Sequence, residues 1–278
     1  CIMIVQHNIT SMNANRQLGI VGGNLSKATE KLASGYRINR AADDAAGLAI
    51  SEKMRAQVRG LNRASDNAQD GISLIQTAEG ALDQQHAILQ RVRELVVQGG
   101  NSGVLDSGVA SGSGDDDFQK IQDEILELKK EFERINSQTQ FNKKKLLNGD
   151  YQSQWLQIGA NDGEGIGVTI STTAWASVSV LAGVAGTDGS QIAIVDSMIK
   201  SVTTVRSKLG AIQNRLEYTV KVDDNTAENL QAAESRLRDT DMADEMTRFS
   251  KESILQQAAT SMLAQANQAN QGVLSLLG

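Results

Sequence analysis

The chain has 278 residues, a formal net charge of −6, one cysteine and no proline. One cysteine excludes an internal disulfide framework and a cysteine-rich zinc site, and the acidic balance gives no reason to expect nucleic acid as a partner. Apolar residues make up 40% of the chain and aromatic residues only 3%. With the missing proline, this disfavours an all-β sandwich and favours long helices. The sequence holds no run of about 18 apolar residues, so membrane insertion is not expected.

Both ends of the chain are uncharged but contain apolar residues. Residues 1–15 and 253–278 contain no Asp, Glu, Lys or Arg. Such segments suit helices packed in a protein interior, where their amides find hydrogen-bond partners. A lone C-terminal helix is expected to be marginally stable. Ordering each residue costs about 1–2 kcal/mol, whereas only the apolar side chains return about 1.5–3 kcal/mol each when they are buried. We therefore expect both ends to be mobile in a monomer and helical after self-assembly. The predicted polymer-interface positions are Ile9, Met12, Leu18, Leu25, Ile254, Leu263, Val273 and Leu274.

Helical spacing of apolar residues begins near the N-terminus and then becomes a long heptad repeat. Residues 18–32 contain a first stripe: Leu18, Val21, Leu25, Ala28 and Leu32. From Asp44 to about Gln98 we expect one helix of about 80 Å, with Asp43 or Asp44 as its N-cap and Gly99-Gly100 as its end. Its core stripe recurs every seven residues, at Leu61, Ala68, Ile75, Leu82, Leu89 and Val96.

Two further heptad stripes follow a loop over residues 101–117 that is rich in Gly, Ser and Asp. Both have gaps of three and four residues, which requires helical partners. Between them, Ile166, Val168 and Ile170 alternate with small or polar residues after the Asn161-Asp162-Gly163 turn, which predicts a β-hairpin. The stripes are Ile121, Ile125, Leu128, Phe132 and Ile135, and then Met198, Val202, Val205, Leu209, Ile212 and Leu216.

The predicted fold class is mainly α: a long antiparallel helical rod or coiled coil formed by both chain halves, with a small β-hairpin insert at its far end. Short connections make neighbouring helices antiparallel and bring the two chain ends together. Beyond Leu216, a helical pattern continues through Leu230, Ala233 and Leu237 to Met242, Met246 and Phe249. Residues 172–190 are rich in Ala, Gly, Ser, Thr and Val and receive no firm assignment.

The sequence shows no catalytic or metal site, and we expect neither an enzyme nor a cofactor. HExxH, CxxC, GxSxG and Walker A patterns are all absent. His7 and His86 are far apart in sequence, and structural or surface roles fit them better than a site, which needs convergent groups. The run Asp115–Asp117 suits a helix N-terminus better than calcium binding, and Lys143–Lys145 suits a solvated turn.

Several long blocks in the right order resemble bacterial flagellin. The N-terminal blocks include residues 9–14, 32–39 and 41–50, the last reading Ala-Ala-Asp-Asp-Ala-Ala-Gly-Leu-Ala-Ile. Residues 90–95 and 136–142 resemble the next blocks, and residues 233–243 and 265–268 the C-terminal region. The resemblance covers about residues 3–170 and 188–278. It implies a subunit of the extracellular flagellar filament, secreted through the export channel, with little or no variable outer domain.

The resemblance also implies an organisation in layers and a set of partners. Residues 1–45 and 234–278 would form an inner core of paired helices, and residues 46–150 and 188–233 an outer core. Residues 151–187 would hold the hairpin and a short variable connection. The implied partners are further copies of the chain, an export chaperone, the filament cap and the hook–filament junction proteins.

In the flagellin family, a vertebrate Toll-like receptor recognises the outer-core helices. Matching motif positions implies that Arg91 and Leu95 carry this recognition, since Arg91 has five donors and Leu95 lies one turn along on the same face. Packing against a neighbouring subunit is an equally strong role for the set. The remaining candidates are Gln90, Gln98 and Glu124.

Two other interpretations remain open at the level of sequence. A hook–filament junction protein shares the helical ends, but residues 41–50 and the C-terminal block favour flagellin itself. A non-flagellar helical signalling or partner-binding module explains the heptads and leaves the two uncharged ends unexplained. Polymerisation on seeds separates a filament subunit from such a module.

Overall fold

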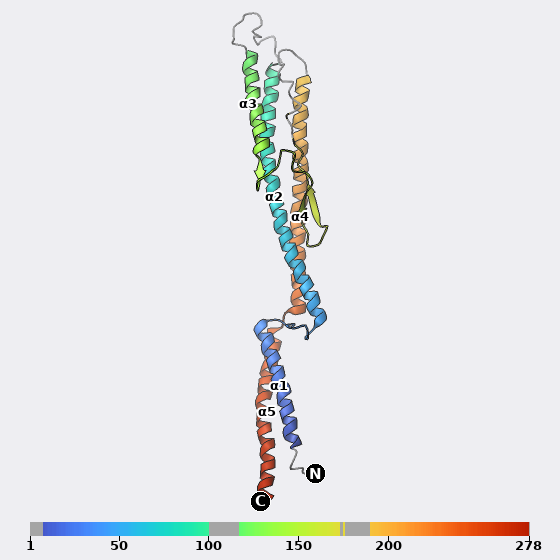
Figure 1. Ribbon diagram of the computed structural model, residues 1–278, viewed down its shortest axis with the longest axis vertical. Coiled ribbons are helices and arrows are strands. Elements are labelled where there is room, and N and C mark those ends of the chain that lie inside the picture. The colour runs from blue at the N-terminus through green and yellow to red at the C-terminus, as the bar shows by residue number, and fades with distance from the viewer. Residues whose placement is uncertain (1–7, 100–116, 173–174, 176–189, 278) are drawn as a thin grey trace, which may run out of the picture. The chain divides into compact units, whose positions relative to one another are not determined.

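The computed structural model describes residues 8–99, 117–172, 175 and 190–277 (Figure 1). Within these residues, four short strands follow the third helix and precede the fourth, in two antiparallel pairs. The prediction of a mainly α fold with a small β-hairpin is confirmed. The helices are α1 (Ile9–Ser34), α2 (Ala45–Gly99), α3 (Asp117–Gln138), α4 (Ser190–Arg238) and α5 (Met242–Leu277); the strands are β1 (Gln140–Phe141), β2 (Lys144–Lys145), β3 (Gln154–Gln157) and β4 (Gly165–Val168).

Local capping explains where the first two helices begin and end. The side chain of Asn8 caps α1, and Gly35 ends it with a φ of 76°, a left-handed conformation that glycine adopts without strain. Oδ1 of Asp44 accepts a hydrogen bond from the N–H of Gly47 at 2.9 Å, so the predicted N-cap of α2 is confirmed. The predicted end of α2 at Gly99-Gly100 stays a prediction, because α2 continues to Gly99 and Gly100 lies outside the described residues.

The chain divides into two compact units, which we describe separately. We call residues 1–58 and 228–278 the terminal unit, and residues 59–227 the central unit. The continuous helices α2 and α4 each contribute residues to both units.

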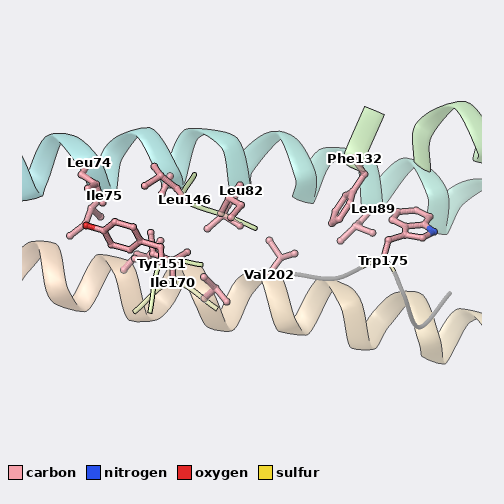
Figure 2. Packing of buried hydrophobic residues seen from close by; sticks show 14 of the residues in the cluster. Leu74, Ile75, Leu82, Leu89, Phe132, Leu146, Tyr151, Ile170, Trp175 and Val202 are labelled. Carbon is pink, nitrogen blue, oxygen red and sulfur yellow. The ribbon is translucent and has the colours of Figure 1, made fainter. Parts of the chain in front are cut away.

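The core of the central unit lies between α2, α3 and α4. Figure 2 shows Leu74, Ile75, Leu82 and Leu89 of α2 at this core, together with Val202 of α4. Every residue of the predicted α2 heptad stripe from Leu61 to Val96 is buried. The α3 and α4 stripes also face this core, so three independent periodicities identified the packing faces correctly.

The predicted hairpin is present, but it lies against the flank of α2 and not at the far end of the helices. Leu156 of β3 pairs with Ile166 of β4 in an antiparallel register. Two glycines inside α2 allow this approach: a Cβ on Gly60 would lie 2.9 Å from the Cβ of Ala160, and one on Gly71 would lie 2.7 Å from Cδ2 of Leu156. The glycines therefore make room for a sheet beside the helix, which the heptad pattern alone did not indicate.

A second, smaller hairpin was not predicted. Strands β1 and β2 pair around a turn in which Asn142 and Lys143 have positive φ values of 47° and 65°. The lysine run therefore forms part of an exposed turn, at Lys143, and the whole of β2, at Lys144 and Lys145. Leu146 and Leu147 follow it and are fully buried. Most of the unassigned segment 172–190 lies outside the described residues. Trp175 is described, and the centroid of its ring lies 5.1 Å from that of Phe132 (Figure 2).

In the terminal unit, α1 and α5 pack against each other in antiparallel directions. Nδ2 of Asn8 donates to the carbonyl of Ala266 at 3.0 Å, while the N–H of Arg37 donates to the carbonyl of Arg238 at 2.7 Å. The expected meeting of the two chain ends is confirmed. The predicted continuous pattern from Leu230 to Phe249 is wrong at one point, because residues 239–241 separate α4 from α5 and Asp241 caps the new helix.

Candidate assembly surface

The terminal unit has almost no core of its own. Among its described residues, Ala28 and Ile38 are the buried hydrophobic side chains, whereas the extended core cluster belongs to the central unit. Apolar surface left uncovered on a water-soluble unit marks an interaction site. The exposed large hydrophobic residues of the terminal unit are Ile9, Met12, Ile20, Ile50, Met242, Met246, Ile254, Leu255 and Met262.

The predicted interface positions separate into an inner and an outer set. Leu18 and Leu25 of α1 are half-buried, as is Leu263 of α5. α1 packs against α5 within the terminal unit, and partial cover by this pairing accounts for the half-burial of these three positions, which we call seam residues. Sequence periodicity does not distinguish such cover within one chain from a contact between chains.

The outer set faces solvent. Ile9, Met12 and Ile254 are 59%, 68% and 67% exposed, and the unpredicted Met262 is 63% exposed. We call these four residues the free apolar face. The predicted positions Val273 and Leu274 lie in α5, but their side chains are outside the described residues.

The amides in the uncharged ends bind across the helix pair. Besides the bond from Asn8 to Ala266, the hydroxyl of Ser11 donates to Oδ1 of Asn267 at 2.7 Å. Amide and hydroxyl groups that are hydrogen-bonded in this way cost little free energy to bury, whereas burial of a charged side chain requires an oppositely charged partner. The α1–α5 pair can therefore enter an interior without taking a charge out of water along residues 253–277.

The receptor candidates lie in the central unit, and their exposure differs. Nε of Arg91 donates to Oε1 of Glu124 at 2.9 Å, and the hydrogen bonds that Arg91 donates to Glu124 and Glu94 raise the pKa of its guanidinium. Gln90 and Gln98 are exposed, and Gln90 contacts the ring of His86. Leu95 differs from the expectation of a shared surface with Arg91: it is 2% exposed, since it belongs to the heptad core.

One cluster was missed in the sequence. The side chain of Arg238 lies over the ring of Tyr36, binds Glu52 at 2.9 Å and approaches Glu234 at 3.9 Å. It joins the end of α1, the start of α2 and the end of α4, all within the terminal unit. These residues come from both ends of the chain and follow no periodic pattern. In the sequence they were marked only by their places in the blocks at residues 32–39 and 233–243.

The described residues include no group of three or more His, Cys, Asp or Glu side chains arranged to hold a metal ion. None of the described helices is both long and apolar enough to cross a bilayer. The chemistry of this part of the chain is that of apolar contact, amide hydrogen bonds and surface ion pairs.

The fold and its uncovered apolar face define a class of protein: a helical structural subunit that packs against other chains. Two family descriptions match, "Bacterial flagellin N-terminal helical region" over residues 5–152 and "Bacterial flagellin C-terminal helical region" over residues 192–277. The chain belongs to the bacterial flagellin family and is a structural subunit of the extracellular flagellar filament.

Relatives over the whole length agree with this assignment. The chain is 53% identical to a flagellin of Halalkalibacterium halodurans and 48% identical to a flagellin of Bacillus subtilis. It is 47% identical to the flagellar filament 31.3 kDa core protein of Treponema maltophilum. Each comparison covers 99% of this chain and 100% of the relative.

Proposed function

We propose that the terminal unit is the part of the chain that drives polymerisation, with the free apolar face as its contact with neighbouring subunits. The observation that carries this proposal is the exposure of Ile9, Met12, Ile254 and Met262 on a helix pair whose uncharged ends are already satisfied internally. The subunit has a structural role and requires no catalytic group for it.

This assignment extends to the layers of the filament. In this proposal, residues 1–45 and 234–278 form the inner core, residues 46–150 and 188–233 the outer core, and residues 151–187 the hairpin region and short variable connection. The separate core of the central unit supports an outer layer that keeps its fold before assembly.

Seeded polymerisation of a variant carrying both Met12→Gln and Ile254→Gln tests the role of the free apolar face. Each lost burial removes about 1.5–3 kcal/mol, which raises the critical concentration by at least about tenfold, since 1.4 kcal/mol is a factor of ten. The critical concentration is measured by sedimenting the polymer after seeded growth. Circular dichroism of the free subunit checks that both helices survive.

Leu126→Gln provides the matched control, because Leu126 is 45% exposed but lies on α3 of the central unit. We expect its critical concentration to remain within about threefold of the unchanged chain. Polymerisation of the Met12→Gln, Ile254→Gln variant at the unchanged concentration would refute the proposed surface.

We further propose that the monomer is recognised by the vertebrate flagellin-sensing Toll-like receptor through Arg91, Glu124, Gln90 and Gln98. The exposed Arg91–Glu124 pair supports this, because it presents a charged, hydrogen-bonding patch at the helix surface. Leu95 would act beneath it by supporting the position of α2. Replacing Arg91 with Ala should weaken receptor binding by about tenfold, while Arg134→Ala, a similar exposed arginine on α3, should not. Equal affinity of both variants for the receptor in a direct binding assay would show that Arg91 is not part of the receptor-binding surface.

The remaining partners follow from the position of a filament subunit in its assembly. We propose an export chaperone that covers the apolar α5 before secretion, and contacts with the filament cap and the hook–filament junction proteins at the two ends of the polymer. The exposed Ile254 and Met262 support a need for such cover. Chaperone capture by the unchanged chain and loss of capture by a chain lacking residues 253–278 tests the first of these.

A further inference from the structure

The loop between β2 and β3 contains an asparagine followed by a glycine, and the peptide bond between them is free of hydrogen bonds. Asn148 is exposed, and its side-chain Nδ2 donates to Oδ2 of Asp150 at 3.1 Å. Neither the carbonyl of Asn148 nor the N–H of Gly149 forms a hydrogen bond with a described residue. Gly149 has a φ of 87°, which glycine adopts without strain. This peptide plane can therefore turn without breaking a hydrogen bond of its own.

An asparagine side chain in this position can react with the backbone that follows it. The Gly149 nitrogen attacks Cγ of Asn148, the new N–Cγ bond closes a succinimide ring, and the Cγ–Nδ2 bond breaks. The proton released by the Gly149 nitrogen leaves with Nδ2 as ammonia. Water then opens the ring: cleavage of the new bond gives aspartate, and cleavage of the original peptide bond gives isoaspartate. Glycine favours the closure, because no Cβ crowds the approaching side chain.

A second asparagine of the same unit, Asn161 in the turn between β3 and β4, is held against this reaction. Its Nδ2 and its backbone N–H each donate to the carboxylate of Glu164 at 3.0 Å. Its carbonyl accepts from Nε2 of Gln157 at 2.7 Å and from the N–H of Glu164 at 3.4 Å. Ring closure at Asn161 has to break the bonds at this carbonyl, which Asn148 lacks. We expect folding to slow the reaction at Asn161 by about tenfold.

We propose that Asn148 is a site of spontaneous deamidation in the folded subunit, with the Gly149 nitrogen as nucleophile and water as the co-reactant. The aspartate product places a negative charge beside Asp150. The isoaspartate product also adds a carbon to the backbone between Leu147 and Tyr151, which are 0% and 6% exposed and belong to the core cluster. Because both ends of this short loop are fixed by packing, the added carbon strains it.

Deamidation rates in the full-length subunit test the proposal. The chain is kept at pH 8, folded or unfolded in urea, and the mass gain of each asparagine peptide is followed by mass spectrometry. The ratio of the unfolded to the folded rate removes the effect of the neighbouring residue. We expect this ratio to be below about threefold at Asn148 and at least about tenfold at Asn161. Equal ratios at the two sites would overturn the proposal, as would an Asn148 that reacts only in urea.

Two further measurements test the mechanism and the cause of the difference. An isoaspartate-specific methyltransferase should label the aged Asn148 peptide, and a deamidated peptide without label would overturn the ring intermediate. Glu164→Ala removes the carboxylate that holds Asn161, so the folded rate at Asn161 should rise at least about threefold. The rate at Asn148 should not change. An equal rise at both sites would show a general loosening of the unit and would overturn the local explanation.

Discussion

The guanidinium carbon of Arg238 lies 4.5 Å from the centroid of the Tyr36 ring. Only 14% of the Arg238 side chain is exposed, and the same guanidinium binds Glu52. Around it, Tyr36 pairs with Asp239, and the N–H of Thr240 donates to the carbonyl of Gly35 at 3.0 Å. Nη2 of Arg37 also donates to the carbonyl of Leu237 at 2.6 Å. The two halves of the chain are therefore joined, at the base of the α1–α5 pair, by two arginine side chains and a few backbone bonds.

Arg238→Ala should loosen this junction. We expect a loss of about 1–2 kcal/mol, because the change removes a ring contact and the closer of the two arginine partners of Glu52, leaving Arg55 at 3.6 Å. Arg238→Lys should recover less than half of this lost free energy, since lysine lacks the planar guanidinium that stacks on Tyr36 and binds Glu52 at the same time. Hydrogen exchange at the amides of Arg37 and Thr240 measures the effect directly, because both amides bond across the junction.

The control for the junction is Arg248→Ala. Arg248 is also an arginine of the terminal unit, but its side chain is 61% exposed, and its partners Asp244, at 3.3 Å, and Glu245, at 3.8 Å, both lie on its own helix, away from the junction. Exposed pairs of this kind contribute about 0–1 kcal/mol. Exchange at Arg37 and Thr240 that is no faster in Arg238→Ala than in Arg248→Ala would show that the arginine does not hold the two halves.

A buried carboxyl makes the stability of the central unit depend on pH. Asp223 is 8% exposed, and no described residue donates a hydrogen bond to its Oδ2. Burial raises the pKa of Asp223 above its ordinary value, and the nearby charges of Asp224 and Glu164 raise it further. A raised pKa in the folded state favours the fold below the unfolded pKa, and this contribution is lost as pH rises through the folded pKa.

Asp223→Asn should therefore stabilise the central unit at pH 7, by about 1 kcal/mol. The advantage of the variant should shrink as pH falls towards 4, because the unchanged Asp223 then takes up its proton. Urea unfolding between pH 7 and pH 4 measures both. Asp66→Asn is the control, since Asp66 is an exposed aspartate of the same unit that pairs with Arg63; a constant gap between Asp223→Asn and the unchanged chain at every pH would contradict the assignment.

Two glycines of α2 should respond oppositely to the same substitution. Gly60→Ala places a Cβ 2.9 Å from the Cβ and 3.2 Å from the Cα of Ala160, so the hairpin must move, and we expect a loss of about 1–3 kcal/mol. Gly80 has no such neighbour within 4 Å, and Gly80→Ala should stabilise the helix by up to about 1 kcal/mol. Urea unfolding of the free subunit compares them, and a gain for Gly60→Ala would show that the hairpin is not held against α2.

Removal of residues 253–278 should abolish polymerisation and leave the central unit folded. The extended core belongs to the central unit, and the deleted residues belong to the terminal unit. Both tryptophans, Trp155 and Trp175, belong to the central unit, so their fluorescence during urea unfolding reports on that unit alone. Filaments formed by the shortened chain, or a loss of its cooperative fluorescence transition, would contradict the separation of roles.

The elements that the sequence predicted well are those whose burial depends on one periodic stripe. The α2 repeat from Leu61 to Val96 is correct at every position, because one helix packed on two neighbours buries one stripe. Leu18 and Ile9 were not distinguished, since the partner of α1 decides which becomes a seam residue and which remains exposed. Arg238 and Tyr36 were missed because no local rule links residues so far apart in the chain.

The hairpin illustrates the same limit. Alternation at Ile166 and Val168 predicted strand β4, while its position beside α2 depends on Gly60 and Gly71, whose absent side chains leave no apolar signal. The free apolar face was predicted as a region because charge is missing from both ends. Which residues belong to that face could not be predicted, because it depends on how α1 pairs with α5.

The exposed sulfur of the terminal unit has a chemical consequence. Met12, Met242, Met246 and Met262 are each at least 48% exposed, whereas Met54 and Met198 are half-buried. Peroxide converts an accessible thioether to a polar sulfoxide. Oxidants should therefore damage unassembled subunits at side chains that they use for packing. In assembled subunits, neighbouring copies should cover the same side chains and protect them from oxidation.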